Sequence, residues 1–272
     1  MNPYQTLKTQ TLAIAVLFAI AAFAAAYFSA SAIVIVIVLV IAIVGLVWRL
    51  FRALQREFGE QQFRNFRQIE ALTGLYGTLD IHNPLPRTRH TAASPDFLQL
   101  LANEIFRIRP EIIVEVGSGT STLIAAYCLK KLGRGKIVSL DHLEKYADIT
   151  RQTIELHDLN NFAEVVHAPL KAYQLDGAEF QWYESTALEK IERIDLLVVD
   201  GPPQAVSNRA RYPAIPLLND KLHPGSIILL DDGARDDEKQ TVALWKERYG
   251  LDYSAEPMEK GAFICQFDRG NP

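Results

Sequence analysis

Four acidic side chains follow short apolar segments of this chain, and their positions are the first indication of chemistry. Asp141 follows one segment, Asp200 follows a second, and the pair Asp231-Asp232 follows a third. Each segment has the length and the continuous hydrophobicity of a strand that is buried on both faces of a parallel sheet. The carboxyl ends of such strands share one edge of the sheet, where α/β proteins bind their ligands. We therefore predict that the four carboxylates lie at one site.

A glycine-containing turn ends an earlier apolar segment. Gly117 and Gly119 flank a serine in this turn, and hydroxyl residues follow it. The two glycines let the backbone approach a ligand closely, and the start of the next helix offers free N–H groups. A full dinucleotide fingerprint needs a third glycine at position 122, where this chain has threonine. The turn taken alone therefore leaves a purely structural role open.

Asp141 lies 22 residues after Gly119. An acid at this place can accept hydrogen bonds from both hydroxyls of a ribose. The same residue type is also a good cap for the helix that follows. Both interpretations remain open from the sequence.

Three of the carboxylates need a compensating charge. Ends of adjacent strands lie about 5 Å apart, so Asp200, Asp231 and Asp232 can share one divalent ion. Without compensation they would repel one another and raise at least one pKa. A cation, an arginine such as Arg235, or a bound proton must therefore balance them. Each acid alone could instead be a helix cap or a turn residue. Three histidines, His90, His142 and His167, are alternative candidates for a general base in catalysis.

The elements that must position these residues alternate from residue 94 onward. Short apolar runs predict five parallel strands, at 112–116, 137–140, 164–167, 194–199 and 227–230. Helical patterns lie between them, opening at Ser94-Pro95 and then covering about 120–132, 142–158, 205–222 and 235–248. Asp176-Gly177 between aromatic residues predicts a small hairpin over 170–183. The segments 251–255 and 262–267 predict a final antiparallel pair.

These motifs together resemble those of class I S-adenosylmethionine-dependent methyltransferases. The motifs are Glu115-x-Gly117-x-Gly119-Thr120-Ser121, Asp141-His142, His167-Ala168-Pro169-Leu170, Val199-Asp200-Gly201-Pro202-Pro203 and Leu230-Asp231-Asp232. The resemblance covers about residues 94–267. It implies an α/β, Rossmann-like fold with a seven-stranded, mostly parallel sheet, helices on both faces, and an antiparallel last strand.

The resemblance also implies the residues that bind the cofactor, S-adenosylmethionine. Its methionine part would lie over Gly117, Ser118, Gly119, Thr120 and Ser121. Glu115 would lie near the amino group of the cofactor, Asp141 would hold the ribose hydroxyls, and His142 would lie beside the adenine. Asp200 would border the cofactor. Ala168-Pro169-Leu170 offers only backbone groups to the adenine amine.

For the chemistry, the chain is similar to O-methyltransferases that hold Mg²⁺ after the fourth and fifth strands. Asp200, Asp231 and Asp232 are the matching candidates as catalytic residues and metal ligands, although Asp232 replaces an amide. The ion would lower the pKa of an acceptor hydroxyl; without it, Asp200 could be a general base. The expected acceptor is a small-molecule or lipid-linked, envelope-related hydroxyl. Candidates for recognising it are Trp182, Tyr183, Arg211 and Tyr212. The alternative functions are a nicotinamide-dependent oxidoreductase and a catalytically inactive membrane scaffold of this fold.

The first 48 residues differ in composition from the rest, with Lys8 as their one charged side chain. Residues 11–48 are uncharged and as one helix would span about 57 Å, against roughly 30 Å of hydrocarbon in a bilayer. We therefore predict a transmembrane hairpin over 1–48, with helices at about 12–28 and 32–48 and a turn at Ser29–Ala32. Signal-peptidase cleavage at Ala30-Ser31-Ala32 and a buried strand are the alternatives.

Basic residues predict the orientation of this hairpin. Five arginines follow the second helix, Arg49, Arg52, Arg56, Arg64 and Arg67. Positive flanks stay in the cytoplasm, so the domain over 94–272 is expected at the cytoplasmic face, typically of a bacterial inner membrane. Residues 49–93 are predicted to be an amphipathic connector bent near Gly59, which would lie on lipid or pack on the domain.

Composition excludes several classes of partner. The 272 residues carry a formal net charge of −4, and residues 49–272 carry 27 bases against 32 acids. This balance argues against binding nucleic acid by phosphate neutralisation. Cys128 and Cys265 lie too far apart to indicate a zinc cluster or a redox pair. The expected partners are therefore a lipid bilayer and the methyl acceptor.

Overall fold

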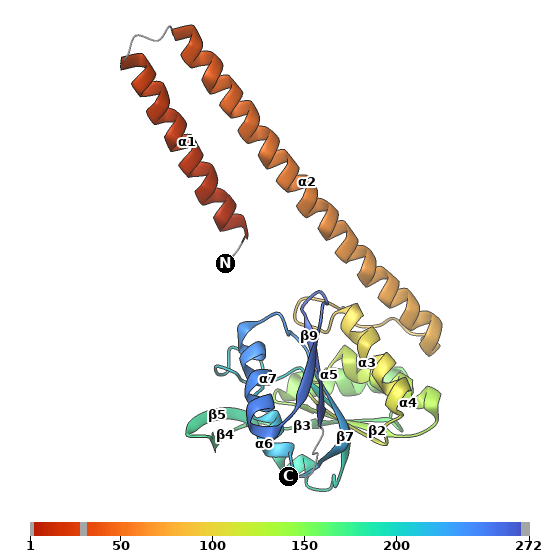
Figure 1. The fold of residues 1–272 in the computed structure, drawn as a ribbon. Coiled ribbons are helices and arrows are strands. Elements are labelled where there is room, and N and C mark those ends of the chain that lie inside the picture. The colour runs from red at the N-terminus through yellow and green to blue at the C-terminus, as the bar shows by residue number, and fades with distance from the viewer. Residues whose placement is uncertain (1–2, 28–31, 268–272) are drawn as a thin grey trace. The chain divides into compact units, whose positions relative to one another are not determined.

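The computed structural model describes residues 3–27 and 32–267. Contacts within the chain divide it into two compact units, Met1–Asn65 and Phe66–Pro272. The first unit is helical, and the second contains the sheet (Figure 1).

Two helices make up the N-terminal region, α1 (Pro3–Tyr27) and α2 (Ala32–Leu79). The prediction that a helix ends at residue 48 and that the next one bends near Gly59 is wrong, because α2 is one helix of 48 residues. Glycine keeps its N–H group and costs a helix only about 1 kcal/mol relative to alanine. A Cβ at Gly45, Gly59 or Gly77 would meet no described atom within 4 Å, so no neighbour forces a bend there. The predicted turn, Ser29–Ala32, lies mostly outside the described residues.

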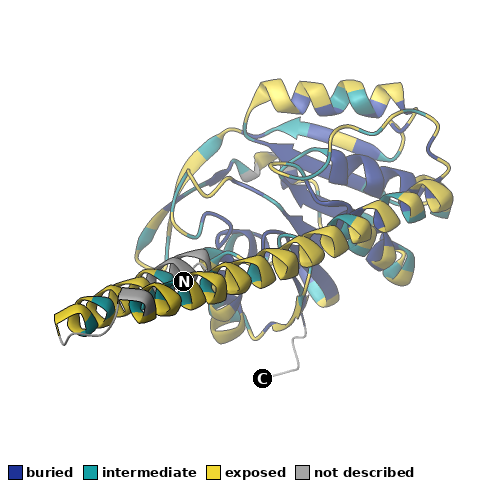
Figure 2. Cartoon of the chain, turned by 90° about the horizontal axis from the view of Figure 1, so that it is seen from above, coloured by how far each residue is buried: buried dark blue, intermediate teal, exposed yellow. Residues whose placement is uncertain are grey.

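The same region was expected to hold two membrane spans. Among the described residues, one helix, Val34–Leu79, is long and apolar enough to cross a membrane, and none of its most apolar 18-residue window is buried. Figure 2 shows α2 exposed along most of its length. The apolar part of α1, Thr11–Tyr27, is shorter than the roughly 20 residues that a span needs. The described residues therefore support one candidate span rather than the expected two.

The second unit is built on a seven-stranded sheet with the order β3-β2-β1-β6-β7-β9-β8. Its strands are β1 (Ile112–Val116), β2 (Lys136–Asp141), β3 (Ala163–His167), β6 (Ile194–Val199), β7 (Leu222–Leu230), β8 (Asp252–Glu256) and β9 (Ala262–Phe267). All neighbours pair in parallel except β9, which is antiparallel to both β7 and β8. The predicted strands and the final antiparallel pair are therefore confirmed.

Helices cover both faces of this sheet. One face packs against α3 (Pro95–Ile108), α4 (Thr120–Leu132), α5 (Glu144–Leu156) and the last turns of α2, through a core that includes Leu79, Leu101 and Ile113. The other face packs against α6 (Ala214–Leu218) and α7 (Asp236–Tyr249), with Trp245 fully buried. This is the α/β arrangement expected from continuous apolar strands.

A small hairpin and a short helix complete the unit. The hairpin, β4 (Leu170–Leu175) and β5 (Ala178–Tyr183), forms a separate two-stranded sheet, as predicted. Asp176 and Gly177 both have positive φ, as its tight turn requires. The helix predicted over 205–222 is wrong in extent, because only α6 is helical there. Arg209 has φ of 50° and Pro213 lacks an N–H, so neither continues a helix.

Candidate active site

Strand register brings the predicted residues into one row. Val116 of β1 pairs with Leu140 of β2 and with Val199 of β6, and Val199 pairs with Leu230 of β7. The residues that follow these four are Gly117, Asp141, Asp200 and Asp231. The strand order reverses at β1, with β2 on one side and β6 on the other, which is where such sheets bind ligands.

Gly117 permits close contact between the ends of β1 and β6. Its φ is +104°, and a Cβ there would lie 2.8 Å from the carbonyl oxygen of Asp200. A larger residue would therefore separate the two strand ends. Gly119 is different, because a Cβ there would meet no described atom within 4 Å. The loop thus leaves open space beside Gly119 and none beside Gly117.

Glu115 is a fully buried acid just before this loop. Its Oε2 accepts hydrogen bonds from the hydroxyls of Thr122 and Ser139, the latter at 2.6 Å. Its Oε1 has no hydrogen-bond partner among the described residues. Burial raises the pKa of Glu115 to about 6, although Ser121 and the two bonded hydroxyls oppose the rise. A buried carboxylate oxygen without a donor is suited to a cationic ligand group such as an ammonium.

Thr122 takes the place of the absent third glycine. Besides donating to Glu115, its hydroxyl accepts the N–H of Gly119 at 3.0 Å. It thereby joins the loop to the strand, a role that the sequence pattern did not indicate. Thr120 and Ser121 are also buried, in the first turn of α4.

The position of Asp141 is compatible with both roles that the sequence left open, a helix cap and a ligand of the ribose hydroxyls. Its Oδ1 accepts the N–H of Leu143 at 3.0 Å, just before α5 begins. Its Oδ2 accepts the hydroxyl of Ser118 at 2.8 Å. The acid therefore ties the glycine loop to the start of α5, and each oxygen keeps a second lone pair. The ring of His142 stands edge-on to that of Tyr183, with centroids 6.0 Å apart.

The three acids Asp200, Asp231 and Asp232 come together in space. One carboxylate oxygen from each lies within 4.8 Å of the others. Asp231 and Asp232 are buried, and only 13% of the Asp200 side chain is exposed. This spacing would suit a metal ion, but protein groups already contact most of these oxygens.

Three basic side chains neutralise the acids. Arg211 Nη2 lies 2.6 Å from Asp232 Oδ2 and 3.0 Å from Asp200 Oδ1. Lys260 Nζ lies 2.8 Å from Asp231 Oδ2, as an ion pair without hydrogen-bond alignment, and 3.2 Å from Asp232 Oδ1. Arg235 Nη1 lies 3.0 Å from Asp232 Oδ2. All three cations therefore converge on Asp232.

Sequence reasoning found only part of this compensation. It named Arg235 as a balancing charge and Arg211 as an acceptor-recognition candidate, and it missed Lys260, which lies in the turn between β8 and β9. Lys260 carries no local sign of its role, because the contact depends on the pairing of β7 with β9.

The pKa values of the acids differ with these contacts. Burial raises the pKa of Asp200 well above its usual value, and the negative charge of Asp231 adds to the rise. Burial also raises the pKa of Asp231. For Asp232, burial is outweighed by Arg211, Lys260 and Arg235, which hold its pKa below the usual range. Asp232 is therefore an ion-paired carboxylate, whereas Asp200 is the group that favours a proton.

The other residues proposed to recognise an acceptor are mostly structural. Trp182 and Tyr212 are buried in the core, where Trp245 Nε1 donates to the backbone carbonyl of Tyr212 at 2.9 Å. Tyr183 is buried too, and its hydroxyl lies against Gly201. Burial raises its pKa well above 10, with further contributions from Asp141 and Asp200. Tyr183 therefore lies against the segment that directly follows Asp200.

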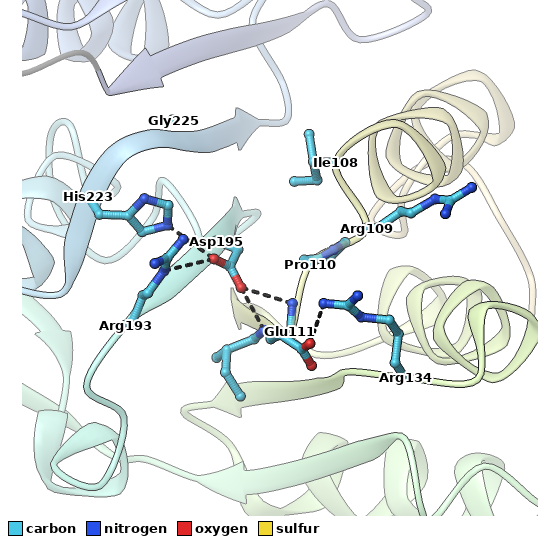
Figure 3. A pocket seen from close by; sticks show the side chains of 10 residues that line it. Ile108, Arg109, Pro110, Glu111, Arg134, Arg193, Asp195, His223 and Gly225 are labelled. Carbon is cyan, nitrogen blue, oxygen red and sulfur yellow. Dashed lines mark hydrogen bonds and ion pairs between the residues drawn. The ribbon is translucent and has the colours of Figure 1, made fainter.

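A separate cavity lies where the strands begin, at the end of the sheet opposite this row (Figure 3). Its volume is about 540 Å³, and its lining includes Glu111, Arg134, Arg193, Asp195 and His223. Asp195 accepts from Arg193 Nε at 3.1 Å, from the backbone N–H groups of Glu111 and Ile112 at 2.9 and 3.0 Å, and pairs with His223 Nε2 at 3.0 Å. The carboxylate joins the starts of β1, β6 and β7.

Comparisons with known proteins agree with the geometry of the strand ends. Residues 114–233 match a family model described as a methyltransferase domain. This segment contains the glycine loop and all four strand-end acids. No curated protein matches the chain at a significant level.

Several solved structures share the fold. A Podospora anserina methyltransferase, PaMTH1, bound to SAH has a TM-score of 0.52 and 17% identity, covering 73% of this chain and 88% of that one. An O-methyltransferase from Bacillus cereus in complex with SAH has a TM-score of 0.50 and 20% sequence identity, and the match covers 74% of this chain and 90% of that one. Cofactor-bound Rv0187 from MTB has a TM-score of 0.52 and 20% sequence identity, and the match covers 73% of this chain and 89% of that one. At these identities the likeness shows the Rossmann-like fold, and the matched segment adds the methyltransferase domain.

Proposed function

We propose that this S-adenosylmethionine-dependent methyltransferase transfers a methyl group to a hydroxyl oxygen of a small or lipid-linked molecule at a membrane surface. The single observation that carries the proposal is that Asp141 and Asp200 lie in one row of strand ends at the switch point of the sheet, beside the glycine loop that follows Glu115. The methyltransferase fold and the matched domain support the reaction class. That the similar Bacillus cereus protein is an O-methyltransferase favours oxygen as the accepting atom.

The residues beside the glycine loop fit the cofactor. The unpaired Oε1 of Glu115 suits the ammonium of its methionine part. Asp141 keeps lone pairs for ribose hydroxyls, and the open space beside Gly119 leaves room over the loop. His142 follows Asp141 and its side chain is 18% exposed, which supports its proposed position beside the adenine.

The chemistry then depends on a base for the acceptor proton. When bound, the cofactor supplies a methyl group whose bond to sulfur breaks, leaving its electron pair on sulfur, as the acceptor oxygen attacks the carbon. The proton of the acceptor hydroxyl moves to Asp200 Oδ2, because Arg211 contacts the other oxygen, Oδ1. Burial raises the pKa of Asp200, and a carboxylate with a raised pKa accepts a proton more readily than an ordinary aspartate.

The apolar half of α2 supports the membrane part of the proposal. Its most apolar window is entirely unburied. Arg52 lies over the ring of Trp48, 5.3 Å from its centroid, and more arginines follow along the helix. Tryptophan at the end of an apolar helix and arginines beyond it are typical of a cytoplasmic membrane interface. We therefore place the catalytic domain on the arginine side of a single span.

Calorimetry on the full chain in detergent tests the cofactor assignment. S-adenosylhomocysteine should bind with micromolar affinity, and NAD far more weakly. Transfer of labelled methyl groups from S-adenosylmethionine into a bacterial lipid and metabolite extract then tests the reaction. NAD binding equal to or tighter than that of S-adenosylhomocysteine would overturn the assignment in favour of an oxidoreductase.

A fractionation experiment tests the membrane proposal separately. The full chain should remain with membranes after alkaline carbonate washing, and a reporter fused after residue 272 should be cytoplasmic. A chain released by the wash, or shortened at its N-terminus by cleavage, would contradict the anchor.

A further inference from the structure

We propose that Arg211 and Lys260 take the place of a divalent metal ion in this active site, so that methyl transfer here proceeds without a metal. The inference rests on the proposed function, because it concerns the same site. It favours compensation by basic side chains, one of the alternatives that the sequence left open, over Mg²⁺ held by Asp200, Asp231 and Asp232.

Protein groups already contact most of the carboxylate oxygens that would bind a metal ion. Asp232 has Arg211 and Arg235 on Oδ2 and Lys260 on Oδ1. Asp231 has Lys260 beside Oδ2, and its Oδ1 accepts the N–H of Asp232 at 2.7 Å. Asp200 has Arg211 on Oδ1. Among the described contacts, five of the six carboxylate oxygens therefore face protein donors, whereas Mg²⁺ needs near-octahedral oxygen ligation.

Electrostatic repulsion by Arg211 also disfavours a metal ion at this site. Arg211 Nη2 lies within 3.0 Å of both Asp200 and Asp232. An ion that bridged these two acids would lie a few ångströms from a buried guanidinium. Like charges at such a distance repel strongly in a site of low dielectric constant. The metal and the guanidinium therefore exclude one another, and the guanidinium is part of the chain.

The fold holds Arg211 in place. Only 4% of the Arg211 side chain is exposed, and its Nη1 donates to the carbonyl oxygen of Asp231 at 2.7 Å. The backbone N–H of Arg209 donates to Asp237 at 3.1 Å. The next residue, Tyr212, is held by Trp245. A displacement of Arg211 by a metal would disturb all of these contacts.

Lys260 is fixed by the turn between β8 and β9. Its carbonyl oxygen accepts the N–H of Ala234 at 2.8 Å, and that of Gly261 accepts the N–H of Gly233 at 2.8 Å. Gly261 has φ of +68°, and a Cβ there would lie 2.6 Å from the nitrogen of Ala234. The turn therefore packs directly against the segment that follows Asp231-Asp232. This packing positions the ammonium group of Lys260 beside both acids.

The charge count matches this assignment. The described cluster contains four acids, the three aspartates and the buried Glu238, against the cations Arg211, Arg235 and Lys260. The acids therefore exceed the cations by one, and Oδ2 of Asp200 is the one oxygen of the three aspartates for which no donor is described. Arg211 is thus a positioning residue, which orients Asp200 through Oδ1 and leaves Oδ2 for the proton of the acceptor.

Manganese titration of the full chain in detergent, followed by electron paramagnetic resonance of free Mn²⁺, tests the proposal directly. We expect no saturable binding below about 1 mM, with or without S-adenosylhomocysteine. Lys260→Gln and Arg211→Gln should each gain Mn²⁺ binding, because they release carboxylate oxygens. A tight stoichiometric site in the unaltered chain that Asp232→Asn removes would overturn the proposal.

Activity assays separate positioning from a merely structural role. Label transfer into the extract should be unchanged in excess EDTA. Arg211→Gln should lower the initial rate by about 100-fold, and Arg211→Lys should restore part of it. Lys246→Gln, which removes an exposed ion pair with Asp252, is the matched control and should keep the full rate. Loss of activity in EDTA, regained with Mg²⁺, would contradict the inference.

Two measurements keep these outcomes distinct. S-adenosylhomocysteine calorimetry reports on the proposed function, and Mn²⁺ binding to the unaltered chain reports on the metal site without any acceptor or variant. Thermal unfolding of each variant shows whether it folds. Failure of S-adenosylhomocysteine to bind would therefore refute the function, whereas a Mn²⁺ site would refute only the metal-free assignment.

Discussion

The two ends of the parallel strands hold buried or half-buried aspartates beside arginines, but the two groups of aspartates behave differently. At the starts of the strands, Asp195 receives two backbone N–H groups, Arg193 and His223. Burial alone would raise its pKa, yet these donors hold the pKa below its usual value. At the opposite end, Asp200 is contacted through one oxygen by Arg211, and burial raises its pKa.

The difference shows what separates a structural acid from a reactive one in this fold. Asp195 has both oxygens engaged, so it has no capacity left for a substrate. Asp200 lies beside Asp231 and keeps one oxygen without such a donor, so it can exchange a proton. The cavity at the strand starts is therefore a structural junction, although arginines and a histidine line it.

The largest expected effect is that of Asp200→Asn. Loss of the base should lower the initial rate of methyl transfer by about 100- to 10,000-fold. S-adenosylhomocysteine affinity should change little, because asparagine keeps the shape of the side chain. Calorimetry and label transfer measure the two quantities. Full activity of the variant would contradict the distinction between a reactive Asp200 and a structural Asp195.

Asp141→Ala should act on binding rather than on chemistry. It leaves ribose hydroxyls without an acceptor at a buried site, so S-adenosylhomocysteine affinity should fall by about 1–3 kcal/mol. The variant also frees Ser118 and the N–H of Leu143, so its thermal stability is the necessary companion measurement. Unchanged affinity in a folded protein would reduce Asp141 to a cap of α5.

Asp195→Ala should lower the stability of the fold and leave methyl transfer nearly unchanged. Removal of the carboxylate leaves the N–H groups of Glu111 and Ile112 without their partner, which should lower the free energy of unfolding by about 1–3 kcal/mol. Urea denaturation measures this loss, while label transfer should stay near the unaltered rate at a temperature where the variant is folded. A large loss of activity without a loss of stability would assign a functional role to the second cavity.

The smallest effect is a pH dependence of cofactor binding. Since burial raises the pKa of Glu115 to about 6, the group is mostly protonated below that pH and cannot pair with an ammonium. S-adenosylhomocysteine affinity should therefore weaken by up to about tenfold per pH unit as the pH falls below 6. Calorimetry from pH 5 to 8 measures it, and Glu115→Gln should flatten the profile. An equally steep profile in that variant would mean that another group titrates.

The stability of the fold should depend on Glu115 with a defined sign. Its folded pKa, about 6, lies above the ordinary value of 4.5, so the folded state binds more protons between these values. The free energy of unfolding should consequently fall as the pH rises from about 4.5 through 6. Asp195 should contribute in the opposite sense, because its lowered pKa stabilises the fold above the ordinary value and loses that contribution as the pH falls.

Local patterns in the sequence were sufficient for most of the architecture. Continuous apolar runs predicted β1, β6 and the other parallel strands, and Asp176-Gly177 predicted the hairpin, because side-chain periodicity and turn chemistry act within a few residues. The acids at the strand ends were predicted for the same reason. Parallel strands necessarily present their carboxyl ends at one edge, so Asp141, Asp200 and Asp231 had to lie in one row.

Apart from the local partner Arg235, tertiary structure decided which cations compensate the acids. Lys260 and Arg211 lie 28 and 21 residues from Asp232, and their contacts depend on the pairing of β7 with β9 and on the packing of Tyr212 under Trp245. The helix predicted over 205–222 is interrupted by the positive φ of Arg209 and by Pro213, whereas α2 continues through Gly45, Gly59 and Gly77, where no described neighbour forces a bend. A sequence specifies where a carboxylate stands on its own strand. Which cations reach Asp231 and Asp232 is set by the free energy of the whole fold, because the cost of burying these two acids is offset by cations that include Arg211 and Lys260 from distant segments.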